Sequence, residues 1–266
     1  MGRGSAQRAG HSESPRLSMA TSEDLLDAAA SFGTGYLQWK SWEPGEFGRF
    51  SPLDASYYAA EFGIAAAGGR VLEIGFGNGA VLAWLRARGA ETYGVEANPL
   101  LVERAIQLLG PGRAFSDLQD AALAGMAGTF TQIIALDVLE HVPLESLPGL
   151  LSSIRNLLAP GASAVLRFPN GDSPFGRMYQ HGDPTHVTTL GSIRVTYFAQ
   201  RAGLEVTSIR SPALPVWNVG LSRGFRRFLI RGARQMIEYV VGQLYFGGRS
   251  LPLDPNYTAV LTRPVV

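Results

Sequence analysis

The nonapeptide VLEIGFGNG, residues 71–79, decides the fold of this chain. Its first four residues are typical of a buried strand. The three glycines that follow predict a tight turn whose backbone can approach a ligand without a Cβ in the way. A helix predicted over 79–88 points its N-terminal amides at that ligand. The next apolar run ends on Glu96, at the spacing where a βαβ unit meets ribose hydroxyls. This segment therefore predicts a site for a nucleoside cofactor.

The composition favours one globular domain. With 266 residues, of which 46% are hydrophobic, the chain can bury one sizeable core without a second full domain. Its net charge of +1, with both signs scattered, lacks the strongly basic balance typical of nucleic-acid binding, so we expect no nucleic-acid partner. The absence of cysteine excludes disulfides and thiolate catalysis, and we expect a cytoplasmic protein. No apolar run reaches the roughly 18 residues needed to cross a bilayer.

Strands and helices are predicted to alternate, which indicates an α/β fold with a mostly parallel sheet and helices on both faces. The strands are expected near 70–75, 91–96, 113–116, 131–136, 162–168, 204–211 and 257–262. The helices are expected near 54–62, 79–88, 100–109, 118–124, 144–158 and 192–202.

Three further parts are predicted around this core. Residues 1–20 are rich in Gly, Ser and Arg and lack an apolar h-region, so we expect a disordered leader and no secretory signal. Residues 21–62 are interpreted as a helical and aromatic cap, whose rings either pack on the core or form a lid over a pocket. The remaining domain, 63–266, is expected to carry insertions at 169–190, which reads as irregular, and at 212–255.

The second insertion contains a basic amphipathic segment at 221–246, with five arginines among apolar residues. One interpretation is a surface helix or dimer face with solvated arginines. The other is peripheral contact with an anionic membrane surface or a phosphate-bearing substrate. The sequence leaves the oligomeric state open.

Two carboxylates narrow the choice of cofactor, because the glycine turn alone also fits the dinucleotide pattern G-x-G-x-x-A. Glu73 lies inside the first strand, where an unpaired buried charge costs about 5 kcal/mol or more. The α-ammonium of a methionine-like ligand would pair with it, and an internal Arg or Lys is the alternative. Asp137 ends the fourth strand, at the edge where open parallel sheets bind ligands.

At this point the chain resembles the class I S-adenosylmethionine-dependent methyltransferases. The resemblance is carried by VLEIGFGNG at 71–79, by Glu96, by DVLEHV at 137–142 and by NLLAPG at 156–161. It implies S-adenosyl-L-methionine as cofactor. It also implies a Rossmann-like, seven-stranded sheet whose last strand, near 257–262, runs in reverse beside the sixth.

The same resemblance assigns roles to individual residues. Gly75, Gly77 and Gly79 would cradle the cofactor, and Glu73 would act on its amino acid end. Glu96 would accept hydrogen bonds from both ribose hydroxyls. Asp117 and Leu118 would contact adenine, with Asp120 as a substitute for Asp117. Asp137 would face the sulfonium.

Methyl transfer to a hydroxyl requires a base that removes its proton. The first candidate is His186 and the second is His141; each is otherwise a buried imidazole satisfied by the backbone. His181, Asp183 and His186 could instead hold a divalent metal with Glu140 or Asp137. The flexible loop spacing does not favour this, and we assign no metal from the sequence.

A looser likeness concerns the acceptor. The pieces WKSW at 39–42, DPTH at 183–186 and PNY at 255–257 look like methyltransferases of bacterial cell-surface polysaccharide and O-antigen pathways. This implies a glycan or related small-molecule acceptor, methylated on a hydroxyl. A lipophilic acceptor such as a quinone precursor is the nearest alternative. Two alternative functions stay open. One is an NAD-linked oxidoreductase, although Glu73 and Asp137 argue against it. The other is a protein that binds the cofactor without turnover.

Overall fold

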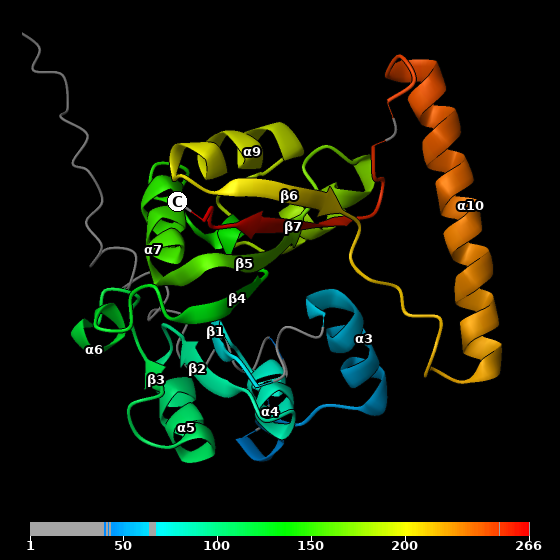
Figure 1. Ribbon diagram of the computed structural model, residues 1–266. Coiled ribbons are helices and arrows are strands. Elements are labelled where there is room, and N and C mark those ends of the chain that lie inside the picture. The colour runs from blue at the N-terminus through cyan, green and yellow to red at the C-terminus, as the bar shows by residue number, and fades with distance from the viewer. Residues whose placement is uncertain (1–39, 41, 43, 64–67, 250, 266) are drawn as a thin grey trace, which may run out of the picture.

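In the computed structural model, which describes residues 40, 42, 44–63, 68–249 and 251–265, a seven-stranded sheet forms the centre of the molecule (Figure 1). Its order is β3-β2-β1-β4-β5-β7-β6. The first five strands in this order pair in parallel, whereas β7 is antiparallel to both β5 and β6. The expected Rossmann-like sheet with a reversed last strand is therefore confirmed. The strands are β1 (Arg70–Ile74), β2 (Glu91–Val95), β3 (Ala114–Phe115), β4 (Phe130–Leu136), β5 (Leu158–Pro169), β6 (Glu205–Arg210) and β7 (Asn256–Thr262).

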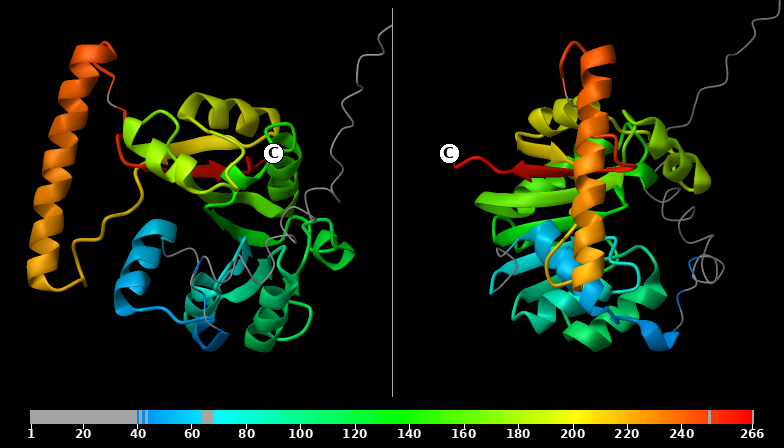
Figure 2. Two further views of the ribbon diagram at one scale, coloured as in Figure 1. Left: turned by 180° about the vertical axis from the view of Figure 1, so that it is seen from behind. Right: turned by 90° about the vertical axis from the view of Figure 1, so that its right-hand side faces the viewer.

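Helices cover both faces of this sheet (Figure 2). Two apolar clusters lie under α3 (Pro52–Phe62), α4 (Ala80–Ala87) and α5 (Pro99–Leu109). The largest cluster lies on the other face, under α6 (Ala121–Ala124), α7 (Leu147–Leu157) and α9 (Ser192–Arg201).

The amphipathic pattern of α7 shows why these segments dock as helices. Leu147, Leu151 and Ile154 recur at helical spacing and are buried against the sheet. At the start of α3, Ser51 and Asp54 form a capping box that satisfies amides of the first turn.

Three boundaries differ from those expected. The stretch 169–190 is not simply irregular, because it contains η4 (Pro174–Gly176) and α8 (Arg177–Gly182). β5 starts at Leu158 and not near 162, since a register shift in β4 lets Leu158 pair with Phe130. The helix expected over 118–124 is a single turn. The leader at 1–20 and the first part of the aromatic cap lie outside the described residues.

The insertion at 212–255 contains α10 (Leu221–Tyr245), which lies along one side of the body (Figures 1 and 2). Hydrogen bonds join it to the segments of the insertion that precede and follow it. Arg227 Nη1 donates to the carbonyl of Pro215 at 2.9 Å, and the amide of Leu253 donates to Glu238 Oε1 at 2.8 Å. Within the described part of the chain, no helix is long and apolar enough to span a membrane.

Candidate functional site

The turn after β1 requires glycine at three positions. Gly75, Gly77 and Gly79 have φ values of 68°, 50° and 71°, which L side chains rarely adopt. A Cβ on Gly77 would lie 2.6 Å from Trp42 Cη2, and one on Gly79 would lie 2.5 Å from Phe47 Cζ. Aromatic rings of the cap thus pack directly on the turn. The glycines therefore make room for these rings as well as for a ligand. The sequence did not reveal this second requirement for glycine.

Glu96 holds the turn from the carboxyl end of β2. Its Oε2 accepts from the amide of Gly77 at 3.1 Å, and its Oε1 accepts from the amide of Asn98 at 3.1 Å. Burial raises the pKa of Glu96, and the backbone hydrogen bonds from Asn98 and Gly77 oppose this shift. The side chain is therefore fixed, while each oxygen keeps acceptor capacity for a ribose hydroxyl.

Glu73 is buried in β1 and lacks a full set of partners. Its Oε2 has no hydrogen-bond partner, and no lysine or arginine among the described residues is paired with it. Burial raises the pKa of Glu73 well above its ordinary range, and the charge on Glu96 raises it further, although a backbone hydrogen bond from Leu82 opposes them. The expected alternative, an internal Arg or Lys, is thus not found in this part of the chain. A buried oxygen without a partner fits the ammonium group of a methionine-like ligand.

The raised pKa of Glu73 predicts how stability depends on pH. The folded protein binds the Glu73 proton more tightly than the unfolded chain does. Protonation of Glu73 therefore stabilises the folded state. This stabilisation is fully present below the pKa that Glu73 has in the unfolded chain, and it is lost as the pH rises towards its pKa in the folded protein. The glutamine of the Glu73→Gln variant has no titratable group, so this part of the stability does not change with pH. Between pH 5 and pH 8, we expect the free energy of unfolding of the wild type to fall relative to this variant, by at most about 1.4 kcal/mol per pH unit. Urea unfolding of both proteins across this range measures the difference, and parallel profiles would contradict the assignment.

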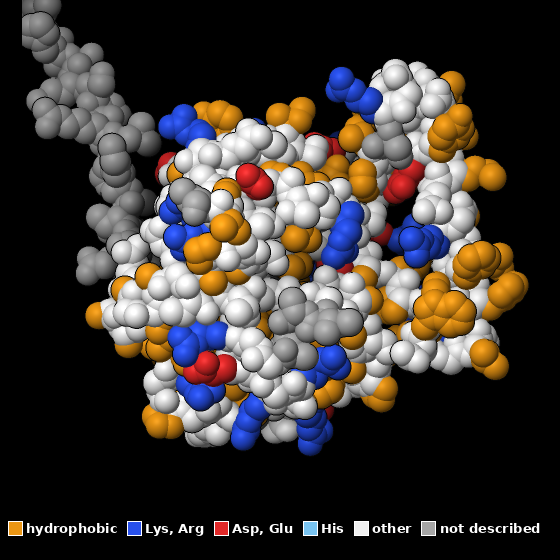
Figure 3. Space-filling view, in the orientation of Figure 1, with side chains coloured by type: hydrophobic (Ala, Val, Ile, Leu, Met, Phe, Trp, Pro, Cys, Tyr) orange, Lys and Arg blue, Asp and Glu red, His pale blue; other side chains and the backbone are white. Residues whose placement is uncertain are grey.

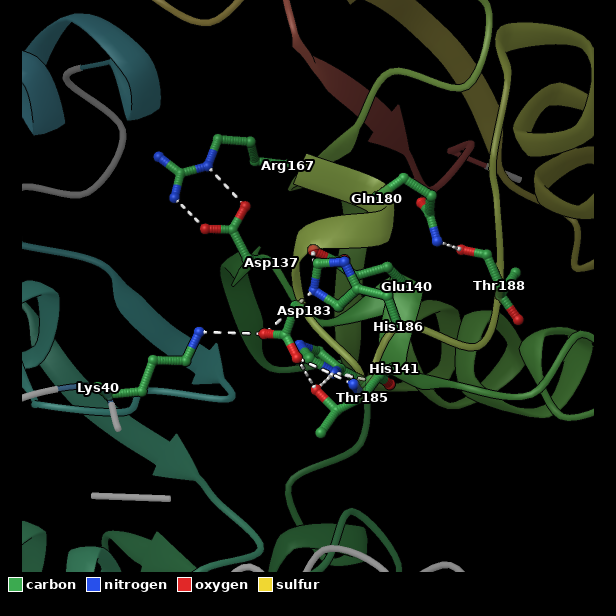
Figure 4. Close-up of polar contacts among 10 residues, drawn as sticks. All are labelled: Lys40, Asp137, Glu140, His141, Arg167, Gln180, Asp183, Thr185, His186 and Thr188. Atoms are coloured by element: carbon green, nitrogen blue, oxygen red, sulfur yellow. Dashed lines mark hydrogen bonds and ion pairs between the residues drawn. The ribbon is translucent and has the colours of Figure 1, made fainter. Parts of the chain in front are cut away.

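Asp137 lies beside the glycine turn but is already paired. It has φ 56°, an uncommon conformation for a residue other than glycine. Arg167 Nε donates to Asp137 Oδ1 at 3.0 Å, a second contact joins Nη2 to Oδ2, and Arg167 also donates to the Tyr57 hydroxyl at 2.9 Å (Figure 4). The position of Asp137 facing a sulfonium stays a prediction, with Arg167 as a partner that the sequence did not reveal.

The residues predicted to meet adenine follow β3. Asp117 is exposed, and its Oδ1 accepts from the amide of Gln119 at 2.9 Å; Leu118 is half-buried beside it. Asp120 caps α6 by accepting from the amide of Ala122 at 2.8 Å, so its carboxylate has a structural role. Contact of Asp117 and Leu118 with adenine stays a prediction.

A second group of polar residues lies at the same edge of the sheet (Figure 4). Glu140 and His141 come from η3 (Leu139–His141), directly after β4, and His186 comes from the loop after α8. His186 Nε2 lies 3.8 Å from Glu140 Oε1 and 3.6 Å from Asp183 Oδ2. The two imidazole rings stand edge to face with their centroids 4.6 Å apart. The structure thus brings together both predicted base candidates, whereas His181 is an exposed residue of α8.

Burial sets the protonation of this group. Both carboxylate oxygens of Glu140 are buried without a hydrogen-bond partner. Burial, with a smaller effect of the Asp137 charge, raises the pKa of Glu140 to about 8. The pKa of His141 is lowered by burial first and by His186 second. The site is therefore one in which protons are held or released close to neutral pH.

Thr185 fixes the orientation of His141. Its hydroxyl donates to Asp183 Oδ1, so its oxygen accepts from His141 Nδ1, 3.0 Å away. The lone pair of the neutral imidazole is then on Nε2. Lys40 Nζ lies 3.3 Å from the other oxygen of Asp183. Neither Thr185 nor Lys40 was predicted as a site residue, although both lie in the short motifs DPTH and WKSW.

Comparisons with known proteins identify the family of this chain. A family model described as "Methyltransferase domain" matches residues 52–209. The chain is 30% identical over 141 residues to the ubiquinone biosynthesis O-methyltransferase of Dechloromonas aromatica. That match covers 50% of this chain and 59% of the relative, so the chain spans well under two thirds of the relative's length.

Two solved structures share the fold. A SAM-dependent methyltransferase of Archaeoglobus fulgidus has a TM-score of 0.58 at 20% identity, covering 85% of this chain and 99% of that one. A TehB-like SAM-dependent methyltransferase of Corynebacterium glutamicum has a TM-score of 0.52 at 16% identity, covering 89% and 99%. The matching family model covers more than half of the chain. The chain therefore belongs to the methyltransferase domain family.

Proposed function

We propose that this protein is an O-methyltransferase that acts on a hydroxyl of a saccharide or related small molecule. The observation that carries this proposal is the group formed by Glu140, His141 and His186, which lies next to the Asp137 edge where the cofactor is expected. S-adenosylmethionine, when bound, supplies a methyl group on a positively charged sulfur. The chain must then orient the acceptor and remove its proton.

Residues on the glycine side would hold the cofactor. The two oxygens of Glu96 would accept hydrogen bonds from ribose hydroxyls, and the unpartnered Oε2 of Glu73 would meet the ammonium group. The glycine turn, with Trp42 and Phe47 packed against it, would exclude water from the bound nucleoside.

Residues on the histidine side would handle the acceptor. His186 Nε2 would take the proton of the acceptor hydroxyl, and the nearby carboxylate of Asp183, whose pKa is lowered, would stabilise the imidazolium that forms. The polar groups of Lys40, Thr185 and Arg167 lie in the same region (Figure 4). Their hydrogen-bonding capacity favours a hydroxyl-rich acceptor such as a saccharide.

A second candidate acceptor is a lipophilic hydroxylated compound such as a quinone precursor. Its support is the likeness to a relative named as a ubiquinone biosynthesis O-methyltransferase, together with the apolar side chains exposed along α10. Both candidates require removal of a hydroxyl proton, so the two differ in acceptor and not in chemistry.

Transfer of labelled methyl from S-adenosylmethionine to a panel of acceptors separates these candidates. The panel contains sugar nucleotides, lipid-linked saccharides and prenylated dihydroxybenzenes. We expect label in a saccharide at a hydroxyl oxygen, located by mass spectrometry after hydrolysis. Label in the prenylated aromatic compounds alone would favour the second candidate. Label on nitrogen, or on none of the panel despite cofactor binding, would contradict O-methylation of these classes.

A further inference from the structure

We propose that Glu140, His141 and His186, named here the EHH site, bind a divalent transition-metal cation. Each residue offers one ligand atom, and these atoms all lie within 4.8 Å of one another. Two imidazole nitrogens and one carboxylate oxygen form a donor set suited to Zn²⁺, Fe²⁺ or Co²⁺ and not to Mg²⁺, which prefers oxygen. The site differs from the grouping weighed from the sequence, because it contains His141 and lacks His181 and Asp183.

The distance between the ligand atoms of Glu140 and His186 is close to what a cation requires. Atoms bound at about 2.0–2.2 Å from a tetrahedral Zn²⁺ lie about 3.4 Å apart. His186 Nε2 and Glu140 Oε1 are 3.8 Å apart, so a shift of a few tenths of an ångström brings them to that distance.

The carboxylate of Glu140 provides an independent reason to expect a ligand. The residue is 1% exposed, and neither of its oxygens has a hydrogen-bond partner. Buried polar atoms are nearly always satisfied, since an unmet one is costly. Lys40 does not satisfy this carboxylate, because its ammonium lies on Asp183. A cation between Glu140 and the two histidines would be a partner for the Glu140 carboxylate and for the lone pair of each imidazole.

The surroundings of His141 prepare it to be a ligand. Its Nδ1–H faces the Thr185 hydroxyl, which donates onward to Asp183, so the lone pair that would bind a metal is on Nε2. Histidine ligands in metalloproteins usually donate their other ring N–H to such a partner, which fixes ring and tautomer. Thr185 and Asp183 are therefore positioning residues for the EHH site.

The catalytic consequence rests on the proposed function, although the cation site itself does not. A cation here would lie where the acceptor hydroxyl must lose its proton, and would make that proton more acidic. His186 would then act as a ligand and not as the free base, and the proton of the hydroxyl would pass to solvent water.

Titration of the full chain with Co²⁺ tests the inference without any methyl transfer. We expect one equivalent to bind, with visible absorption bands of a nitrogen- and oxygen-ligated ion. Affinity should fall at least tenfold in His141→Ala and in Glu140→Gln, and remain unchanged in the matched control His181→Ala. Zn²⁺ should also raise the melting temperature of the wild type, which would show binding even if one variant folds poorly.

The possible outcomes separate this inference from the proposed function. Absence of Co²⁺ binding in the wild type, or binding that persists in both variants, would overturn the EHH site. Methyl transfer that proceeds in full after removal of metal by a chelator would overturn its catalytic consequence and leave the proposed function standing. Co²⁺ binding without transfer to any acceptor would count against the proposed function alone.

A separate observation concerns the outer face of α10, and from it we infer contact with an anionic lipid surface. Apolar side chains recur along one stripe of this helix and are exposed, with Leu221 at 96% and Met236 at 70% (Figure 3). The stripe is formed by Leu221, Phe225, Phe228, Leu229, Met236, Tyr239 and Val240.

The charges of α10 favour lipid over a second copy of the chain. Five arginines and one acid, Glu238, lie on this helix. Arg227, Arg234 and Glu238 bond to the flanking segments of the insertion, at 215 and 253–254, so the opposite apolar stripe points away from those segments. The other three arginines, Arg223, Arg226 and Arg231, are exposed. Anionic headgroups beside an inserted apolar stripe would be complementary to their charges, whereas pairing two such helices through the stripe would supply no negative charge.

Sedimentation with vesicles tests this contact. We expect the wild type to bind vesicles of phosphatidylglycerol and phosphatidylcholine, and to bind phosphatidylcholine alone at least tenfold more weakly. The double variant Phe225→Ser/Phe228→Ser should lose at least tenfold in binding, whereas Ile193→Ser on α9, which is 84% exposed, should behave as wild type. Equal binding by all three proteins would overturn the inference. So would a dimer, measured by light scattering, that the double variant abolishes.

Discussion

Replacing Glu96 by alanine is expected to weaken binding of S-adenosylhomocysteine at least 100-fold. The carboxylate offers two oxygens to the ribose, and hydrogen bonds to a charged group contribute roughly 1.5–3 kcal/mol each, or about 3–6 kcal/mol together. The same oxygens hold the amides of Gly77 and Asn98, so the variant also loosens the glycine turn. Isothermal titration calorimetry of both proteins measures the loss.

Glu91 provides a matched control on the same strand. It lies at the opposite end of β2, where it pairs with Arg70 at 3.0 Å and accepts from the Tyr93 hydroxyl at 2.6 Å. Glu91→Ala removes a carboxylate from β2 without touching the glycine turn. Its affinity for S-adenosylhomocysteine should equal that of the wild type. If the two variants lose affinity to the same degree, Glu96 has no specific role in the cofactor site.

Replacing His186 by alanine is expected to lower kcat for transfer to a hydroxyl by a factor of about 10² to 10⁴, the usual contribution of a positioned base. Its Nε2 lies 3.8 Å from Glu140 Oε1 and 3.6 Å from Asp183 Oδ2. The loss is expected whether His186 takes the proton itself or binds a cation beside the hydroxyl. Affinity for S-adenosylhomocysteine should change little, because the residue lies on the acceptor side.

The control for His186 is His181→Ala, which removes an exposed imidazole of α8 only five residues away. This variant should retain the rate of the wild type. A parallel fall in cofactor affinity in His186→Ala would sink its assignment to proton removal. Rates for an acceptor that is already nucleophilic should fall much less in His186→Ala than rates for an alcohol.

The sequence predicted the fold well because its signals are local. The glycine turn, the alternating apolar runs and the carboxylates at strand ends are each contained in a few consecutive residues, and parallel strands bring their carboxyl ends to one edge. Hence these local signals predict that Gly75, Glu96, Asp137 and His141 lie at the same edge.

The unpredicted features depend on contacts between distant segments. Trp42 packs on Gly77, and Lys40 reaches Asp183, 143 residues further along the chain. Arg167 neutralises Asp137 from the neighbouring strand. The start of β5 at Leu158 arises from a register shift in β4, which no sequence periodicity encodes. Such pairings follow from tertiary packing, which no short motif specifies.

Calorimetric titration of the wild-type chain with S-adenosylhomocysteine, run beside NADH under the same conditions, tests the central claim most directly. Micromolar binding of S-adenosylhomocysteine alone, with one site per chain, is the predicted result. Binding of NADH, or of neither ligand, would contradict the account of the glycine turn, Glu73 and Glu96 as a site for S-adenosylmethionine.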